Sequence, residues 1–480
     1  MARKKQWMDV KLEEVDYPNR ARGHALCSIE ENEVDRLFGL NERYDKRPLG
    51  RPILAKGGLP GQVYRALAQR NRGGAKEVQL MELLAPSPLE TPLRCPLQGR
   101  CGGCIYQSLS YETEVMLKGE QIRRLFRSAG FDIEVPIQPS PRHEAYRNKM
   151  EYSFGDEEKE GPLRLGLHCP GHFYEIVPTP DCRIVPEDMN RIRAASQAFF
   201  EDRGLSYYHR TRRSGALRHL VIRTAMRTRQ IMVNLVTSSD PSVDETLLSE
   251  YRDLLCALPL DFTLVSLFHT VNDSLADVVQ ADRLDLLWGQ AELEEKLFDL
   301  TFQIGPFSFF QPNVFSAELL YRKALSFAGD LSGQVVYDLY SGTGTLTQLM
   351  ARRAQLAIGV EIVEEAVEKA RATAAANQLR NVQFHAADVL VELDRLAAMG
   401  DPPNLIMIDP PRDGIHPKAL EKIIAAKPER IVYISCNPRS QVRDLILFRT
   451  GGYRLVKAQA IDQFPRTKHV ETVCLMSRKD

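Results

Sequence analysis

Short apolar runs alternate with amphipathic stretches over the last third of the chain, and this alternation constrains the fold more than any other feature of the sequence. Helical stretches separate the runs, most clearly residues 364–377. Strands that alternate with helices form a parallel, doubly wound sheet. Two later runs, 453–461 and 470–476, have no helix between them and are expected to close the sheet as an antiparallel pair. The earlier runs are residues 335–340, 356–362, 382–385, 405–409 and 431–435.

The length of 480 residues leaves room for about three domains at roughly 150 residues each. Residues 63–68 and 77–82 alternate as strands do, with a glycine-containing turn between them, and they predict a small N-terminal β-barrel. A Pro-rich linker follows at 85–92. A helix at 112–128 and the mixed pattern after it predict an α/β central domain. The expected domains are residues 1–85, 86–305 and 306–480.

The composition is that of a folded protein, with 44% hydrophobic and 26% charged residues. No run of about 18 apolar residues is present, so a membrane span is not expected. The basic N-terminus is not followed by an apolar core, so we expect no secretory signal and a cytoplasmic location. Lys plus Arg (63) equals Asp plus Glu (63), so any binding of nucleic acid must come from local patches.

Two regions are locally basic. Residues 1–80 hold 16 Lys or Arg against 11 Asp or Glu. Residues 207–230 hold seven arginines and no acid. Arginine binds phosphate oxygens through its planar fork, and Tyr207 and Tyr208 could stack on unpaired bases, so this stretch predicts contact with RNA. The alternative is a set of strands with arginine on the solvent side. The seven are Arg210, Arg212, Arg213, Arg218, Arg223, Arg227 and Arg229.

A glycine-rich turn, 338–345, follows the first strand of the predicted sheet and opens a helix. Glu361 ends the next strand, nineteen residues after Gly342, where a carboxylate can hold the two hydroxyls of a ribose. Thr347 stands where a dinucleotide motif has its third glycine, which favours an adenosine ligand such as S-adenosylmethionine over NAD. Asp388 ends the third strand and could meet the adenine. The alternative is a structural turn with a chance glutamate.

Two further strand ends carry reactive side chains. Asp409-Pro410-Pro411-Arg412 ends the fourth strand, and Ser435-Cys436-Asn437-Pro438 ends the fifth. The carboxyl ends of parallel strands open into one crevice, so these segments should face the glycine turn. A cysteine there, just before a helix, can have a lowered thiol pKa and act as a nucleophile, whereas a cysteine elsewhere is usually a small core side chain. Glu471 starts the last strand and would by itself pass for a surface residue.

Taken together, the ordered motifs resemble the S-adenosylmethionine-dependent RNA uracil-5 methyltransferases over nearly the whole chain. The resemblance implies a TRAM domain (an OB-like RNA-binding barrel) at the N-terminus and a Rossmann-like class I methyltransferase domain at the C-terminus. It implies that Cys436 is the nucleophile and Glu471 the base. It further implies that the cofactor pocket is lined by Gln311, Tyr340, Glu361 and Asp409. The motifs that carry it are residues 309–313 (Phe-Phe-Gln-Pro-Asn), the glycine turn, Glu361, 409–412, 435–438 and the segment 464–471.

Three of the nine cysteines form a Cys-x5-Cys-x2-Cys motif, namely Cys95, Cys101 and Cys104. Such spacing suits either zinc or an iron–sulfur cluster and requires a fourth ligand, for which Cys182 and Cys169 compete. The family resemblance implies a 4Fe-4S cluster with Cys182 as the fourth ligand. The remaining cysteines expected in the core are Cys27, Cys256 and Cys474.

The sequence therefore predicts an enzyme that makes 5-methyluridine in RNA, with 23S ribosomal RNA as the expected substrate and no membrane or obligate protein partner. The combination of a TRAM-like domain with the cysteine motif resembles the ribosomal branch of the family more than its transfer-RNA branch. One alternative is the same chemistry on transfer RNA. Another is a non-catalytic RNA-binding or iron–sulfur assembly protein on a decayed methyltransferase scaffold. The presence of Cys436, Glu471 and the cofactor residues argues against decay.

Overall fold

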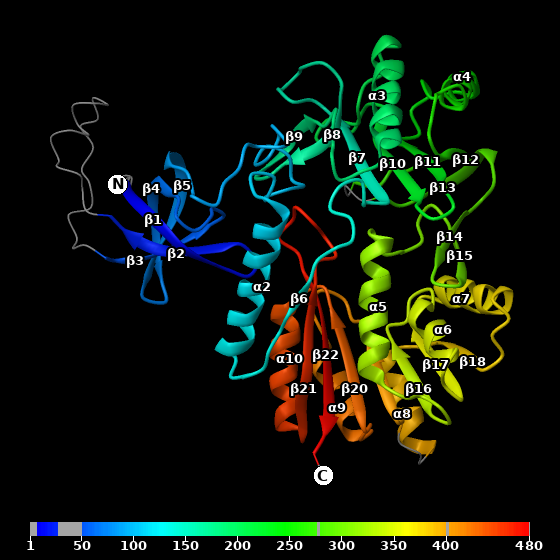
Figure 1. The fold of residues 1–480 in the computed structure, drawn as a ribbon. Helices are drawn as coiled ribbons and strands as arrows, with labels where there is room; N and C mark the ends of the chain where they lie inside the picture. Colours follow the sequence, from blue (N-terminus) through cyan, green and yellow to red (C-terminus); the bar gives the residue numbers. More distant parts are fainter. Residues whose placement is uncertain (1–6, 27–49, 276–278, 400–402, 480) are drawn as a thin grey trace. The chain divides into compact units, whose positions relative to one another are not determined.

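The computed structural model describes residues 7–26, 50–275, 279–399 and 403–479 (Figure 1). Contacts divide the chain into two compact units. The first unit consists of the residues up to Arg94 together with Tyr106–Ile137. The second consists of Cys95–Ile105 and all residues from Gln138 onward, so the cysteine motif belongs to the second unit. Cys27 lies outside the described residues.

The first unit contains the predicted barrel, a closed sheet of five strands in the order β1-β2-β3-β5-β4. Alternate side chains such as Val10, Leu12 and Ile53 fill its interior because successive residues of a strand point to opposite sides. Helix α2 (Tyr111–Ser128) follows the barrel and is capped by the Ser110 hydroxyl, which accepts a hydrogen bond from the Thr113 amide. The strands are β1 (Trp7–Asp16), β2 (Arg20–Ala25), β3 (Pro52–Lys56), β4 (Val63–Arg72) and β5 (Ala75–Ala85).

The second unit begins with a seven-stranded sheet in the order β13-β12-β11-β10-β7-β8-β9. Two helices accompany it, α3 (Glu187–Asp202) and α4 (Glu245–Cys256). A two-stranded hairpin of β14 (Leu293–Leu297) and β15 (Leu300–Ile304) then leads into the rest of the unit. The strands of the large sheet are β7 (Lys149–Gly155), β8 (Arg164–Cys169), β9 (His172–Pro178), β10 (Leu217–Ala225), β11 (Gln230–Thr237), β12 (Thr263–Val271) and β13 (Arg283–Gly289).

The C-terminal part of the second unit is the predicted α/β sheet, with eight strands in the order β18-β17-β16-β19-β20-β22-β21-β6. The five strands from β16 to β20 are parallel, as the alternating pattern predicts. The predicted antiparallel pair is also confirmed, and β22 inserts between β20 and β21 (Figure 1). The strands are β6 (Ile137–Gln138), β16 (Val335–Leu339), β17 (Leu356–Glu361), β18 (Val382–Ala386), β19 (Leu405–Ile408), β20 (Arg430–Ser435), β21 (Tyr453–Ile461) and β22 (Glu471–Arg478).

Six helices accompany this sheet. Helix α5 packs across β20, β21 and β22, and α6 packs against β16, β17 and β18. Helices α8, α9 and α10 contact one another in series. Apolar side chains of α5, α6 and the central strands form one continuous core. The helices are α5 (Val314–Ala328), α6 (Thr345–Ala351), α7 (Glu364–Ala376), α8 (Val389–Met399), α9 (Pro417–Ala425) and α10 (Pro438–Thr450).

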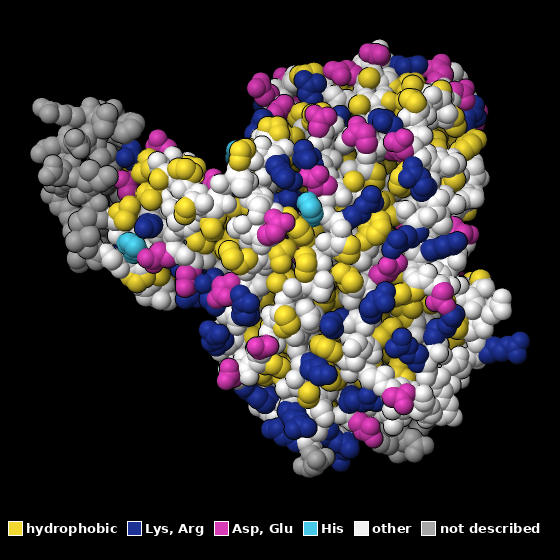
Figure 2. Space-filling model, viewed as in Figure 1, with side chains coloured by type: hydrophobic (Ala, Val, Ile, Leu, Met, Phe, Trp, Pro, Cys, Tyr) yellow, Lys and Arg dark blue, Asp and Glu magenta, His cyan; other side chains and the backbone are white. Residues whose placement is uncertain are grey.

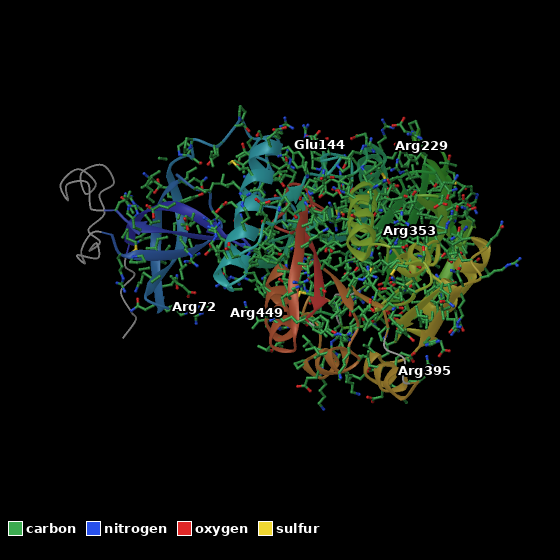
Figure 3. All side chains as sticks on the ribbon, turned by 60° about the horizontal axis from the view of Figure 1, so that its bottom comes forward. Arg72, Glu144, Arg229, Arg353, Arg395 and Arg449 are labelled. Carbon is green, nitrogen blue, oxygen red and sulfur yellow. The ribbon has the colours of Figure 1, made fainter. Side chains whose placement is uncertain are left out.

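The basic stretch 207–230 does not form one exposed surface. Strand β10 lies inside its sheet and is buried along its whole length, so Arg218 and Arg223 are 4% and 5% exposed. Their guanidinium groups donate to backbone carbonyls, Arg218 to Asn272 and Arg223 to Ser308. Arg229, labelled in Figure 3, lies over the ring of Phe262 and donates to the Asp261 carbonyl. The exposed arginines of the stretch lie on either side of β10, Arg212 and Arg213 in the loop before it and Arg227 and Arg229 in the turn after it, while Arg210 is half-buried.

The structure also tests the predictions for two core cysteines and for a membrane span. Cys474 is buried as predicted, but Cys256 is exposed at the end of α4, so its assignment to the core was wrong. The exposure follows from its place on the last turn of an amphipathic helix, where Tyr251 and Leu255 face the core instead. In the described part of the chain, no helix is long and apolar enough to cross a membrane.

Candidate active site

The order of the parallel strands reverses at β16, and open α/β sheets bind their ligands at such a point; the carboxyl-end side of the strands here is called the crevice. Strand β16 pairs with β17 on one side and with β19 on the other, so the loops after these strands diverge at their carboxyl ends. The glycine turn occupies this point. Tyr340 and Gly342 have φ angles of 66° and 53°, and a side chain on Gly344 would place its Cβ 2.4 Å from the Phe384 ring. Tyr340 has a strained left-handed backbone conformation, and the glycines near it carry no side chain. The backbone of the turn is therefore accessible to a ligand.

Glu361 ends β17 directly beside this turn. Its carboxylate accepts hydrogen bonds from the amides of Gly342 (3.0 Å), Ile362 (2.9 Å) and Val363 (3.0 Å). These bonds fix the carboxylate at the mouth of the crevice while leaving lone pairs for further donors. Asp388, exposed after β18, accepts from the Leu390 amide at 2.7 Å. Its charge adds to burial in raising the pKa of Tyr340, so Tyr340 and Asp388 face the same side of the crevice.

Two carboxyl groups lie deeper in the crevice. Burial raises the pKa of Asp338 to about 7, and the hydroxyl of Thr347 donates to one of its oxygens at 2.6 Å. Thr347 therefore ties α6 to β16 where a dinucleotide fold would have a glycine. Burial, together with the charge of Asp338, raises the pKa of Asp409 to about 7. Buried carboxyl groups of this kind take up a positive charge readily, because a nearby cation restores their ionised form.

Cys436 and Glu471 are brought together by strand register. Strands β20 and β22 are antiparallel with Ser435 opposite Thr472, so Cys436, the residue after Ser435, emerges beside Glu471, the residue before Thr472. The Thr472 hydroxyl lies 2.7 Å from Gln441 Oε1 and 3.3 Å from the Ser435 carbonyl oxygen. These contacts fix the end of β22 against the end of β20. Residues 35 positions apart in sequence therefore form one reactive pair.

The electrostatics of this pair differ from the sequence expectation. The pKa of the Cys436 thiol is not lowered but raised to about 11, first by burial and then by the charges of Glu471 and Asp409. Arg412 opposes this shift by hydrogen-bonding to the thiol. Burial and the charge of Asp409 hold the pKa of Glu471 well above its usual range, and Arg412 again opposes the shift. The guanidinium of Arg412 also contacts the His469 imidazole at 2.8 Å.

Arg412 is thus the cation of the site, and the sequence offered no role for it beyond its place in the Asp-Pro-Pro-Arg motif. A second residue without a sequence signal is Tyr321 on α5. Its hydroxyl is hydrogen-bonded to the Gln311 side chain, and its pKa is raised by burial and then by the charge of Asp409. Tyr321 therefore connects Gln311 to the carboxyl groups of the crevice.

Gln311 lies in a loop that is anchored from several sides. The Asn148 side chain donates to the Gln311 carbonyl at 2.9 Å, and the Asn148 amide donates to the Pro312 carbonyl at 2.9 Å. The Gln463 side chain donates to Gln311 Oε1 at 3.3 Å. The predicted cofactor residues Gln311, Tyr340, Gly342, Glu361, Asp388 and Asp409 accordingly come from separate strand ends and loops around one crevice.

The cysteine motif lies elsewhere in the second unit, against the start of the seven-stranded sheet. Cys101 and Cys104 are buried, and Cys95 and Cys182 are half-buried. The Gly102 amide donates to the His168 carbonyl at 3.1 Å, and a Cβ on Gly102 would stand 3.1 Å from that oxygen, so the loop packs tightly on β8. Burial raises the pKa of Cys182 to about 11, and the charges of Cys101 and Cys95 add to the shift. Cys182 is therefore near Cys101 and Cys95. In the described part of the chain, the four predicted ligands do not form a group whose ligand atoms lie within 4.8 Å of one another.

Cys169, the competing ligand, has different partners. It ends β8 and pairs across a tight hairpin with His172, the first residue of β9. Ligand atoms of Cys169, His172 and Glu175 all lie within 4.8 Å of one another. After burial, the charge of Cys101 raises the pKa of both Cys169 and Cys182. The charge of Cys95 is a cause of the shift at Cys182 and not at Cys169.

Comparison with known proteins agrees with this arrangement. A family model described as tRNA (uracil-5-)-methyltransferase matches residues 290–479. A Clostridium tetani protein named an uncharacterized RNA methyltransferase is 41% identical over 90% of this chain and 94% of its own length. A similarly named protein of Caldanaerobacter subterraneus is 40% identical over 89% of this chain and 94% of its own length.

Among solved structures, the tRNA (uracil-54, C5)-methyltransferase of Pyrococcus abyssi, in complex with S-adenosyl-L-homocysteine, superposes with a TM-score of 0.71. It is 26% identical and the match covers 97% of this chain and 99% of that one. A parallel sheet with a glycine turn and a strand-end acid defines a Rossmann-like nucleotide-binding domain, and the relatives place it among the methyltransferases. The chain belongs to the S-adenosylmethionine-dependent RNA uracil-5 methyltransferase family, and it is an enzyme of that class.

Proposed function

We propose that this enzyme transfers a methyl group to carbon 5 of a uridine in RNA, with Cys436 as the nucleophile and Glu471 as the base. The observation that carries the proposal is the register of β20 and β22, which sets a thiol beside a buried carboxyl group. Both open into the crevice that holds Glu361 and Asp409. A thiol and a base at one point are what addition to a pyrimidine ring requires.

The crevice fits S-adenosylmethionine. Glu361 is fixed beside the glycine turn, where it can accept the two ribose hydroxyls. No atom lies within 4 Å of the position that a Cβ of Gly342 would take, so a ligand can approach the backbone. The carboxyl groups of Asp338, which is buried, and Asp409, which is half-buried, suit a cationic ligand. When bound, the cofactor supplies a methyl group on a positively charged sulfonium.

The chain's own residues then account for the steps on the uracil. Cys436 loses its proton and bonds to carbon 6, and the electrons of the 5,6 double bond make carbon 5 nucleophilic. Arg412, hydrogen-bonded to the thiol, stabilises the thiolate. After carbon 5 has accepted the methyl group, Glu471 removes the carbon-5 proton, and the bond between Cys436 and carbon 6 breaks. The charge of Arg412, which is part of the chain and stays after methyl transfer, lowers the pKa of Glu471 toward the ionised form that a base requires.

The proposed RNA is 23S ribosomal RNA. This choice is supported by the closed N-terminal barrel and the nearby cysteines Cys95, Cys101, Cys104 and Cys182 within one chain. Transfer RNA is the second candidate, because the Pyrococcus abyssi enzyme that covers almost the whole chain acts on tRNA. Either substrate is consistent with the proposed cytoplasmic location. We retain the division into RNA-binding barrel (1–85), cluster and central domain (86–305) and catalytic domain (306–480) as part of this proposal.

We also propose that the four cysteines hold a 4Fe-4S cluster. A cluster takes one thiolate at each iron, and the charges of Cys101 and Cys95 at Cys182 support these residues as neighbours in such a set. Protein purified without oxygen should be brown, with about four irons per chain. Cys182→Ser should lose most of that iron. Stoichiometric zinc without visible absorbance, or iron that is lost in Cys169→Ser and kept in Cys182→Ser, would contradict the assignment.

The methyl transfer is tested with RNA that carries 5-fluorouridine. Fluorine cannot leave as a proton does, so the wild-type enzyme should remain bonded to this RNA through Cys436 after methylation. The adduct appears as a slow band on a denaturing gel and should contain labelled methyl groups from the cofactor. Cys436→Ala should give no adduct, while Cys256→Ala, which removes an exposed thiol, should behave as wild type. An adduct in Cys436→Ala would overturn the choice of nucleophile.

A further inference from the structure

A second concave site lies in the seven-stranded sheet, away from the catalytic crevice. Strands β7, β8 and β9 and the loop 206–214 enclose a cavity of about 860 Å³. Of the described residues that line it, none belongs to the proposed catalytic or cofactor set. Ligand-binding cavities commonly measure about 300–1,000 Å³, so this one has room for a nucleotide but not for an RNA duplex.

Aromatic side chains form its walls. The ring of Tyr174 on β9 is 71% exposed at the cavity. Tyr208 lies on the opposite segment, with the guanidinium of Arg218 stacked 4.5 Å from its ring centroid. Tyr207 is fixed by its hydroxyl, which donates to Asp156 at 2.8 Å. Unpaired bases stack on rings of this kind whatever their sequence.

The acidic residues of the lining are engaged with neighbours. Asp156 accepts from Tyr207 and from the Glu160 amide, and Glu160 pairs with Arg212 at 2.7 Å. Glu157 pairs with Arg100 at 2.5 Å. Glu175 lies 3.1 Å from the His172 ring.

Basic side chains also line the cavity, namely Arg210 from the loop 206–214 and Lys159 from the segment between β7 and β8. Because the acidic side chains of the lining are paired, its basic side chains allow a phosphate to bind although the chain as a whole has no net charge.

We propose that this cavity receives one unpaired nucleotide of the RNA, its base against Tyr174 and Tyr208 and its phosphate near Arg210 and Lys159. The proposal rests on the proposed function, since it assumes that RNA is the substrate. It adds a second point of attachment outside the crevice, so the RNA is held by an unpaired base besides the uridine that reacts. Recognition of unpaired bases selects loops over helices.

Binding of short fluorescent oligonucleotides to the full-length protein, without cofactor, tests this site. Single-stranded oligo(U) and oligo(A) are compared with duplex RNA by anisotropy at fixed salt. Tyr174→Ala and Arg210→Ala should each weaken single-strand binding, by about 5- to 100-fold for the tyrosine, and leave duplex binding unchanged. Tyr174→Phe, which keeps the ring, should bind as wild type. Leu286→Ala is the control, because Leu286 is exposed on β13, the edge strand at the opposite edge of the same sheet from β9.

The outcomes separate the alternatives. Unchanged single-strand affinity in Tyr174→Ala and Arg210→Ala, or an equal loss for the duplex, would overturn the site. Displacement of the oligonucleotide by micromolar UMP or AMP would assign the cavity to free nucleotides instead. Cys436→Ala should keep full oligonucleotide affinity. Absence of the 5-fluorouridine adduct in an enzyme with intact Tyr174-dependent binding would therefore count against the proposed chemistry and not against the cavity.

Discussion

Cys436 is poorly suited to be a nucleophile until other residues act on it. Its burial keeps the thiol protonated, with a pKa raised to about 11, and Arg412 is the group that opposes this shift. Burial and the charge of Asp409 likewise raise the pKa of Glu471 well above its usual range. Both shifts favour the uncharged forms of the pair, since an uncompensated buried charge is costly. Arg412 opposes both shifts.

Glu471→Gln separates the base from the nucleophile. The amide keeps the shape of the side chain but cannot accept the carbon-5 proton, so the enzyme should methylate once and then remain bonded to RNA through Cys436. Turnover should fall about 100-fold or more. A denaturing gel with labelled cofactor measures the trapped species on ordinary RNA. Glu429→Gln, at an exposed position, is the control. Normal turnover by Glu471→Gln would mean that another group is the base.

Arg412→Gln tests the stabilisation of the thiolate. Removal of a cation that bonds the thiol should raise the pKa of Cys436 further, by about one unit or more. The rate of alkylation of Cys436 by iodoacetamide should therefore fall at pH 8, and its increase with pH should begin at higher pH than in wild type. Mass spectrometry distinguishes Cys436 from the exposed Cys256. Arg454→Gln on β21 should leave the profile unchanged, and an unchanged profile in Arg412→Gln would remove it from this role.

Periodicity could place Cys436 and Glu361 at the carboxyl ends of strands, where the structure also has them. It gave no sign of Glu471, which by itself passes for a surface residue and which only the family resemblance singles out; the roles of all three residues stay predictions. The sequence could not predict Tyr321, because a tyrosine within a helix carries no sign of which polar groups it will face. The direction of the Cys436 pKa also escaped it. Position before a helix suggests a lowered pKa, but the burial and the two carboxyl groups that outweigh this effect come from β19 and β22.

At the scale of elements, the ends of β16 and β19 bring Asp338 and Asp409 together, and their pKa values of about 7 have a functional consequence. This coupled pair loses protons as the pH rises through about 7, so its attraction for a cation grows over that range. The affinity for S-adenosylmethionine relative to S-adenosylhomocysteine, which lacks the sulfonium charge, should increase between pH 6 and pH 8. Isothermal titration measures the ratio, and Asp409→Asn should flatten it. A ratio independent of pH in wild type would contradict this reading.

The cysteine loop is connected to the segment that carries the base. The Ile105 amide, next to Cys104, donates to the Arg466 carbonyl at 2.8 Å, and the Tyr146 hydroxyl donates to the Pro465 carbonyl at 2.8 Å. Arg466 is fully buried and has a φ angle of 69°, so the segment depends on its neighbours for its conformation.

Removal of iron by an anaerobic chelator should therefore increase hydrogen exchange in residues 464–470. It should also slow release of the Cys436 adduct more than its formation, because Glu471 serves release. Exchange in β12, within the central sheet, serves as the internal control. Unchanged exchange at 464–470 in iron-free protein would separate the cysteine loop from the catalytic base.

The basic stretch shows where a sequence pattern misleads. Seven arginines without an acid predict a charged surface, and the solvent-facing strand was the alternative. Neither prediction describes Arg218 and Arg223. Both are buried because β10 has a strand on each side, and their guanidinium groups donate to backbone carbonyls. Charge pattern reports composition along the chain, whereas burial depends on strand order, which is a property of the complete sheet.

At the scale of the whole molecule, zero net charge excludes general electrostatic attraction to RNA. Acidic and basic side chains are scattered together over the face shown in Figure 2. Binding must then depend on local groups such as the loop 206–214. Arg212→Ala combined with Arg213→Ala should weaken RNA binding and flatten its dependence on salt, with cofactor affinity unchanged. An unchanged salt slope would mean that these exposed arginines are only solvated.

The proposed substrate is tested at the scale of the whole molecule, because the barrel, the cysteine loop and the α/β sheet belong to one chain. A strain lacking the gene should lose 5-methyluridine from 23S ribosomal RNA and keep it in transfer RNA. The wild-type gene should restore the modification and Cys436→Ala should not, which excludes an effect of the protein that is independent of catalysis. Mass spectrometry of nuclease fragments from the two purified RNA classes measures the change. Loss from transfer RNA alone would reject the ribosomal substrate while leaving the chemistry of Cys436 and Glu471 intact, because both substrates present the same uracil ring to the crevice.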